Sequence, residues 1–198
     1  MRLPVMEHFY TIQGEGQNSG WPAYFIRLGG CDVGCIWCDV KDSWDAGKHE
    51  LHEADEIAGW AAASGAKQVV ITGGEPLMYD LTELCDRLQR KGIKTFLETS
   101  GAYELSGTWD WICVSPKKFK PPAEAILGEA DELKVIVYNR SDFDWAKEYA
   151  SKVSGKCRLF LQPEYSVFDR VMPLIIDFVK QHQEWRISLQ THKYMDIP

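Results

Sequence analysis

The chain has 198 residues, 45% of them hydrophobic, with 8 Trp, 8 Tyr and 8 Phe. This composition excludes a disordered chain and suits a single globular domain over residues 1–198. Its 22 Lys and Arg against 29 Asp and Glu give a net charge of -7, which, without a basic cluster, argues against nucleic acid as the main partner. No apolar run is long enough to span a membrane, so we expect no membrane partner and a small-molecule substrate.

Strand-like runs alternate with helical patterns along the chain. The predicted strands are 24–28, 68–72, 94–98, 111–115, 132–138, 158–162 and 186–189, and the predicted helices are 54–64, 81–91, 142–152 and 167–181. Such alternation predicts crossover units on a parallel sheet, and only 116–129 breaks the periodic pattern. Because a closed eightfold barrel takes ~250 residues, we expect an α/β fold with a partial, shortened TIM-like barrel of parallel strands.

Three cysteines in C-x3-C-x2-C spacing, Cys31, Cys35 and Cys38, follow the first predicted strand. Thiolates suit an iron–sulfur cluster, and three of them leave one iron of a four-iron cluster open. Structural zinc needs a second pair of ligands, yet His49 and His52 come eleven and fourteen residues after the last cysteine. A zinc-binding module is therefore the weaker, non-enzymatic alternative.

The other cysteines, Cys85, Cys113 and Cys157, have no paired spacing. Buried packing is the default interpretation for cysteines in apolar segments. The chain shows no targeting segment, and six cysteines without a disulfide pattern indicate a reducing cytoplasm.

Polar motifs follow the predicted strands, and the carboxyl ends of parallel strands meet on one face of the sheet. Arg27 lies near the end of the first strand, and Thr72-Gly73-Gly74-Glu75-Pro76 follows the second. Ser115-Pro116-Lys117 and Gln162-Pro163-Glu164 follow later strands. We therefore expect the site on this face.

The segment 9–16 precedes the first predicted strand and places Glu15 between two glycines. By itself this pattern is typical of a flexible turn. The alternative is a substrate clamp, in which the glycines let the backbone approach a planar ring and Glu15 accepts from the paired N–H donors of an aminopyrimidine.

The cysteine loop, with Trp37 before its last cysteine, and the Gly-Gly-Glu-Pro motif resemble the radical S-adenosylmethionine (SAM) superfamily. With the 9–16 segment, Arg27, Leu189–Lys193 and the ending Asp196-Ile197-Pro198, the whole chain resembles the 7-carboxy-7-deazaguanine synthase family. The resemblance implies a homodimeric lyase of queuosine and deazapurine biosynthesis. It would convert 6-carboxy-5,6,7,8-tetrahydropterin to 7-carboxy-7-deazaguanine and ammonia by radical ring contraction, with an external electron donor such as flavodoxin or ferredoxin.

The resemblance also implies roles for individual residues. Substrate would contact Ile12, Gln13, Gly14, Glu15, Arg27, Thr72, His192 and the carboxylate of Pro198. SAM would contact Trp37, Cys38, Asp39, Gly74, Glu75, Ser115, Pro116, Lys117, Gln162, Pro163, Glu164 and Tyr165. Cys31, Cys35 and Cys38 would hold the 4Fe-4S cluster. No protein side chain is assigned as a catalytic acid or base, because the cofactor supplies the radical.

One position departs from the family pattern. Members commonly carry Thr two residues after the last cluster cysteine, where its hydroxyl binds Mg²⁺, and this chain has Val40. Magnesium prefers oxygen ligands, which a valine side chain lacks. We expect weak or absent magnesium dependence, with Asp39 or Asp42 as the alternative oxygen donors.

A glycyl-radical-enzyme activase is the enzymatic alternative, since such proteins are also small and share the cysteine spacing. An activase needs an open groove for a peptide loop. The segments 13–16 and 190–192 instead favour a closed pocket for a small ring.

Overall fold

The computed structural model describes residues 1–198 and contains one nine-stranded sheet in the order β3-β1-β2-β4-β5-β6-β7-β8-β9. The strands are β1 (Arg2–Ile12), β2 (Pro22–Leu28), β3 (Glu50–Glu53), β4 (Gln68–Gly73), β5 (Lys94–Thr99), β6 (Trp111–Val114), β7 (Glu132–Val137), β8 (Arg158–Pro163) and β9 (Trp185–Ile187). The helices are α1 (Ala54–Ala63), α2 (Thr82–Arg90), α3 (Glu124–Glu129), α4 (Ser141–Ala150), α5 (Phe168–Gln181) and α6 (Thr191–Met195).

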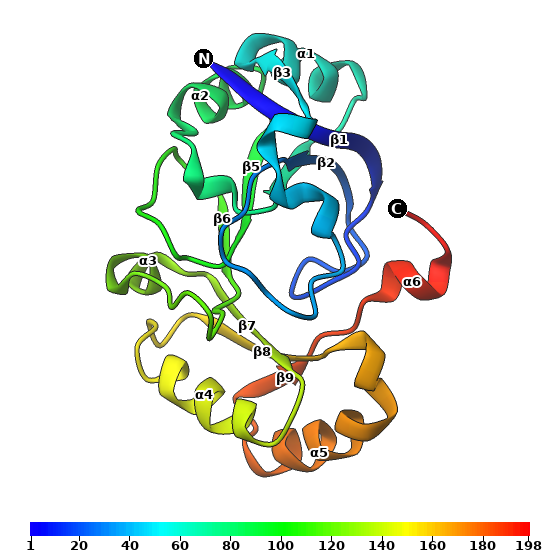
Figure 1. Ribbon diagram of the computed structural model, residues 1–198, viewed down its shortest axis with the longest axis vertical. Helices are drawn as coiled ribbons and strands as arrows, with labels where there is room; N and C mark the ends of the chain where they lie inside the picture. The colour runs from blue at the N-terminus through cyan, green and yellow to red at the C-terminus, as the bar shows by residue number, and fades with distance from the viewer.

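Every neighbouring pair from β2 to β9 is parallel. The sheet curves into a partial barrel with the helices on its outer side (Figure 1). This confirms the predicted α/β class and the parallel order of the strands. No helix combines the length and apolar character needed to cross a membrane.

Four elements were not predicted from the sequence: β1, β3, α3 and α6. β1 is an additional strand and pairs antiparallel with both β2 and β3, so the sheet is mixed at one end. Pro4 and the register shift between Val5 and Glu7 interrupt the alternation that marks a strand. The unpatterned stretch 116–129 ends in the short helix α3, whose two buried side chains, Ile126 and Leu127, are too few to give a periodic signal.

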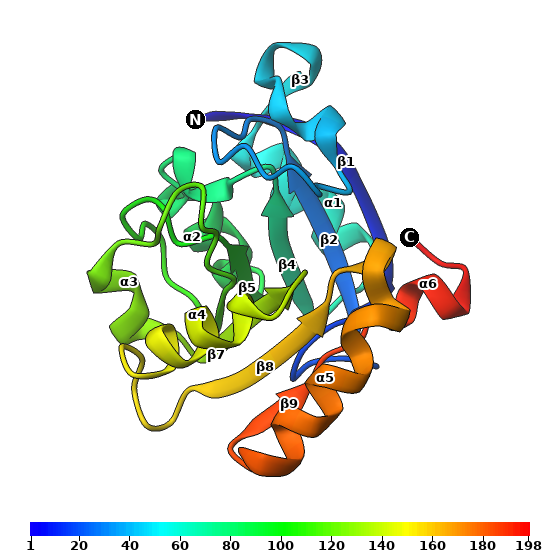
Figure 2. The same cartoon turned by 60° about the horizontal axis from the view of Figure 1, so that its bottom comes forward.

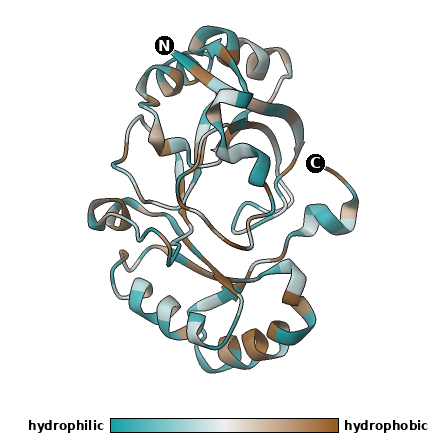
Figure 3. Cartoon of the chain, viewed as in Figure 1, coloured by the Kyte–Doolittle hydropathy of each residue, from teal (hydrophilic) through white to brown (hydrophobic).

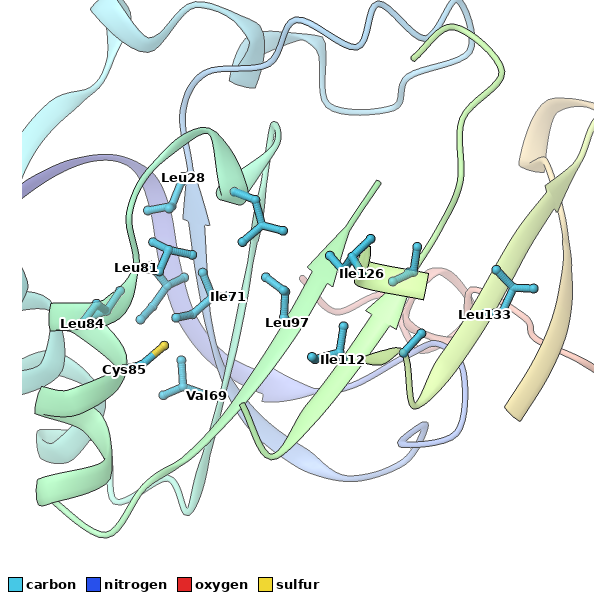
Figure 4. Packing of buried hydrophobic residues seen from close by; sticks show 14 of the residues in the cluster. Leu28, Val69, Ile71, Leu81, Leu84, Cys85, Leu97, Ile112, Ile126 and Leu133 are labelled. Atoms are coloured by element: carbon cyan, nitrogen blue, oxygen red, sulfur yellow. The ribbon is translucent and has the colours of Figure 1, made fainter. Parts of the chain in front are cut away.

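The outward face of the sheet is apolar and holds the main core. Leu28, Ile71, Leu97 and Leu133 lie on β2, β4, β5 and β7 and face the helices (Figure 4). All four are fully buried. The outer helices carry hydrophilic and hydrophobic stretches side by side, as helices with one buried face do (Figure 3).

The inward face is different, because side chains alternate across each strand. A small apolar layer of Ala23, Val70 and Phe96 fills the end of the barrel where the strands begin. On the same inward face, Glu98 lies two residues after Phe96 on β5, and Lys134 lies on β7. The polar positions therefore lie above an apolar floor, toward the carboxyl ends of the strands.

The loop between β1 and β2 closes the open side of the barrel against the segment after β9 (Figure 2). The Gly16 amide donates to Ser188 Oγ at 2.9 Å, and the Thr191 amide donates to the Gly14 carbonyl at 2.9 Å. The C-terminal segment then returns to β1, where Thr11 Oγ1 donates to the main-chain oxygen of Pro198 at 3.5 Å. Residues from the two ends of the chain thus meet at the barrel opening.

Candidate active site

One cavity of about 300 Å³ lies inside the partial barrel. Its wall contains the three cysteines, all eight predicted substrate residues and every predicted SAM residue except Glu75 and Pro116. The strand ends, the β1–β2 loop and the C-terminal segment each contribute to it. Residues separated by almost the whole sequence are therefore brought together as the motif analysis expected.

The cysteine loop is held at the cavity wall by backbone contacts. The Gly30 amide donates to the Ser43 carbonyl at 2.6 Å and the Cys31 amide to the Trp44 carbonyl at 3.1 Å. The Glu75 amide donates to the Gly30 carbonyl at 2.8 Å. Gly74 must be glycine here, because an added Cβ would overlap the carbonyl of Gly30.

Cys31, Cys35 and Cys38 are free thiols. All three line the cavity. Burial raises the pKa of Cys31 and of Cys35, and the nearby Cys38 adds to both increases. No group of His, Cys, Asp and Glu side chains converges as a single-ion site. Three soft ligands without a fourth fit a cluster with one open iron better than a closed zinc site.

Glu75 lies just outside the cavity and is 1% exposed. Its carboxylate accepts from the Ser100 amide at 2.8 Å, the Leu77 amide at 3.0 Å and the Thr99 hydroxyl. It therefore ties the end of β4 to the end of β5 and supports the wall from behind.

Lys117 extends from the end of β6 into the cavity. Its ammonium donates to the carbonyl and the hydroxyl of Ser115, at 2.7 and 2.6 Å, and lies 5.8 Å from the ring centroid of Trp37. Burial lowers the pKa of Lys117. These contacts join the β6 motif to the cysteine loop.

Lys134 forms the centre of the cavity's polar network and is 4% exposed. Its ammonium lies 2.7 Å from Glu15 Oε2 and 2.8 Å from Glu98 Oε2. Gln190 Nε2 donates to the other oxygen of Glu15 at 2.9 Å. Burial alone would raise the pKa of Glu15, but Lys134 and these hydrogen bonds outweigh it and lower the pKa to about 2.

Glu132 lies behind this network. Its Oε2 accepts from the Gln17 amide at 3.0 Å, whereas its buried Oε1 has no hydrogen-bond partner. Gly16 is in the left-handed region (φ 63°), and a side chain there would overlap the Glu132 carboxylate. Burial raises the pKa of Glu132 to about 7; Lys134 opposes this increase and Glu98 adds to it.

Arg27 and His192 both line the cavity. Arg27 Nε donates to Glu7 at 2.6 Å, and its terminal nitrogens have no protein partner. His192 packs against Gly14, where any side chain would overlap its ring. Burial lowers the pKa of His192, which favours the neutral imidazole.

Lys134 lines the cavity but was not singled out from the sequence, whereas Gln190 was expected there as part of the segment 190–192. The signal for Lys134 was present: Glu132 and Lys134 alternate with buried Leu133 and Val135, so two charged side chains occupy the inward face of a buried strand. A charge at such a position is unusual and indicates a paired or functional group.

Comparison with known proteins agrees with this geometry. The Radical SAM superfamily model matches residues 25–112. A 7-carboxy-7-deazaguanine synthase from Flavobacterium psychrophilum is 53% identical over 196 residues, covering 99% of this chain and 93% of the relative. One from Escherichia coli is 36% identical over 223 residues, with both chains covered fully (100%).

The chain belongs to the 7-carboxy-7-deazaguanine synthase family. The crystal structure of QueE from Escherichia coli is similar, with a TM-score of 0.86 and 33% identity over 96% of this chain and 94% of that one. The family resemblance inferred from the motifs is thereby confirmed, and with it the radical SAM core, the iron–sulfur cofactor and the enzymatic class. Membership of this family is favoured over a glycyl-radical-enzyme activase and over a zinc-binding module.

Lys134→Met should destabilise the fold by roughly 1–3 kcal/mol at pH 7, below the cost of a fully buried pair because both carboxylates reach the cavity. Near pH 4 the loss should be smaller, since protonation relieves the repulsion between Glu15 and Glu98. Urea unfolding at both pH values measures this, with Lys152→Met as the exposed control. Equal losses at the two pH values would leave Lys134 with a packing role only.

Glu132→Gln should stabilise the protein more at pH 8 than at pH 5. The folded-state pKa of about 7 lies above the ordinary 4.5, so the cost of Glu132 is least below pH 4.5, grows as pH rises, and is complete above about 7. Glutamine keeps an oxygen for the Gln17 amide. Melting temperatures across this range test the expectation against Glu148→Gln, which changes an exposed carboxylate. A pH-independent shift would contradict it.

Proposed function

We propose that this chain converts 6-carboxy-5,6,7,8-tetrahydropterin to 7-carboxy-7-deazaguanine with release of ammonia. One observation carries the proposal: the three-cysteine loop, the Gln13–Glu15 segment and Arg27 line the same cavity. A cavity of about 300 Å³ suits a small bicyclic ring and not a folded peptide loop.

Arg27 would bind the substrate carboxylate. Its Nε is already held by Glu7, which fixes the plane of the guanidinium, while its two terminal nitrogens remain available. A planar fork of this kind matches a carboxylate with two parallel charge-assisted hydrogen bonds.

Glu15 would accept from the paired N–H groups of the pterin ring. Its low pKa keeps it ionised at any physiological pH, and Lys134 and Gln190 hold both of its oxygens in one orientation. Ile12, Gln13 and Gly14 would approach the ring with their backbone, and Thr72, His192 and the end of the chain at Pro198 would complete the wall.

The cofactor side of the cavity would be formed by the strand-end motifs. Bound SAM, with the cluster held by Cys31, Cys35 and Cys38, supplies a 5′-deoxyadenosyl radical. Gly74 offers backbone close to the cysteine loop, and Lys117 and the segment 162–165 complete the cofactor surface. These residues would orient the reactants and exclude water.

Magnesium dependence is expected to be weak. Val40 lines the cavity and offers no side-chain oxygen. Asp39 is already near Lys193, with its Oδ2 3.8 Å from the ammonium. The homodimer and the cytoplasmic location expected from the sequence stay predictions, as does an external electron carrier.

Anaerobic reconstitution followed by product analysis tests the function. The native protein should bind four irons per chain and form the deazaguanine product from the pterin. Alanine at Cys31, Cys35 or Cys38 should abolish cluster absorption and turnover, because only these thiols share the loop spacing. Cys157→Ala is the control and should keep both. Iron retained in any loop variant, or zinc in the native protein, would refute the assignment.

Arg27→Lys should raise the KM for the pterin by about 10–100-fold, since a lysine ammonium cannot make the bidentate contact. SAM binding should not change. Steady-state kinetics and SAM titration measure the two effects, and Arg87→Lys, at an exposed ion pair, is the matched control. An unaltered KM would indicate that Arg27 does not bind the substrate and only stabilises β1 through its contact with Glu7.

A further inference from the structure

The segment 117–120, after β6, folds back on itself beside the cysteine loop. Lys117 and Lys120 form an antiparallel bridge, and only Lys117 lines the cavity. The Lys117 ammonium lies 5.8 Å from the ring centroid of Trp37, near the end of the cysteine loop. The Lys120 ammonium lies 2.8 Å from Asp32 Oδ2, near the start of that loop. The two ends of this short turn therefore contact the two ends of the cysteine loop.

Asp32 belongs to a closed network of three polar side chains. Its Oδ2 accepts from the Tyr103 hydroxyl at 2.6 Å and from the Lys120 ammonium at 2.8 Å. The Lys120 ammonium also donates to the Tyr103 oxygen at 2.8 Å and lies 4.0 Å from the centroid of the same ring. Each group thus contacts the other two, which restrains their positions more than a single ion pair would.

Tyr103 and Lys120 come from two segments that are joined through the backbone. The Ala123 amide donates to the Gly101 carbonyl at 2.8 Å. Gly101 is in the left-handed region (φ 77°), and an added Cβ would come within 2.9 Å of Pro122. These contacts hold the residues after β5 against the residues after β6. The two donors of the network are therefore positioned independently of the cysteine loop.

Asp32 connects this network to a cluster ligand. It lies directly after Cys31 and before the buried Val33. On the other side, the Cys31 amide donates to the Trp44 carbonyl at 3.1 Å. The first cysteine of the loop is therefore restrained by one contact through its own backbone and by a second through the neighbouring carboxylate.

We propose that Asp32, Tyr103 and Lys120 are positioning residues for the iron–sulfur cluster, which hold Cys31 where its sulfur binds iron. Groups that contact the ligands of a metal from outside commonly orient those ligands and raise the affinity for the metal. Lys120 also compensates the Asp32 carboxylate, which would otherwise add a negative charge beside a cluster bound by three thiolates. The inference goes beyond the proposed function, because it concerns retention of the cluster and not the substrate.

The test compares Asp32→Asn, Tyr103→Phe and Lys120→Met with the double variant D32N/K120M. Anaerobically reconstituted protein is mixed with a chelator of ferrous iron, and the rate of iron release is followed by absorbance. A redox titration monitored by electron paramagnetic resonance gives the midpoint potential of the cluster. Amide hydrogen exchange of residues 31–38 is measured on the metal-free protein.

Two exposed ion pairs provide matched controls. Lys118→Met removes the partner of Asp142 from the same segment after β6. Asp55→Asn removes the partner of Arg87 on the outer helices. Neither control residue forms a hydrogen bond or an ion pair with the cysteine loop.

We expect iron release to be about tenfold faster in the three single variants and in the double variant, at the lower end of the range for such partners because the network is exposed. Residues 31–38 should exchange faster in the same four proteins. The midpoint potential should fall in Lys120→Met, where the carboxylate is uncompensated, rise in Asp32→Asn, and return close to native in D32N/K120M. Both controls should match the native protein, and the melting temperature of the metal-free protein should change little.

Native iron release and native amide exchange in the single variants would overturn the proposal. Native iron release in D32N/K120M would also overturn it, because the network would then act through charge alone. The proposed function fails separately: a native protein that binds four irons but forms no deazaguanine would refute the function and leave the iron-release comparison intact. Conversely, normal product formation with native iron release in every variant would retain the function and reject the positioning role.

Discussion

The buried ammonium of Lys134 is the constraint on which the rest of the site depends. A charge in the interior of a small barrel is tolerated only when it is paired and hydrogen-bonded. Lys134 finds its partners in Glu98, on a nearby strand, and in Glu15, on the loop between β1 and β2. That loop must therefore lie inside the open side of the barrel. The same contact that satisfies the lysine closes the cavity and fixes the carboxylate that faces the ring.

The two faces of the sheet have different compositions. The outer face contacts the helices and contributes most of the apolar core, so stability does not depend on filling the barrel interior. A small apolar layer inside consists of Ala23, Val70 and Phe96, with Phe25 and Trp111 packed against them. The remaining inward positions are free to be polar, and they cluster near the strand ends. Glu75 shows how far this specialisation goes, since a fully buried carboxylate is used only to hold two strand ends together.

The cysteine loop separates two different environments. Toward the barrel, its thiols face an enclosed cavity that suits a small ring and a cofactor. Toward solvent, Ile36 lines an exposed groove together with Phe119 and Tyr138. Trp37 and Lys117 lie between the two.

The sequence by itself determined the parallel α/β order, the cysteine loop and the family, because these depend on local spacing and on alternation within single strands. It also located most of the cavity wall, since the carboxyl ends of parallel strands must meet on one face. Only the tertiary structure decided that β1 is an antiparallel strand, since Pro4 hides its pattern, and that Lys134 links Glu15 to Glu98. Such a contact joins residues 119 positions apart, and no periodicity within a segment encodes which distant charges will meet. The groove at Ile36 likewise exists only because the folded chain brings the loop, β6, β7 and α4 together.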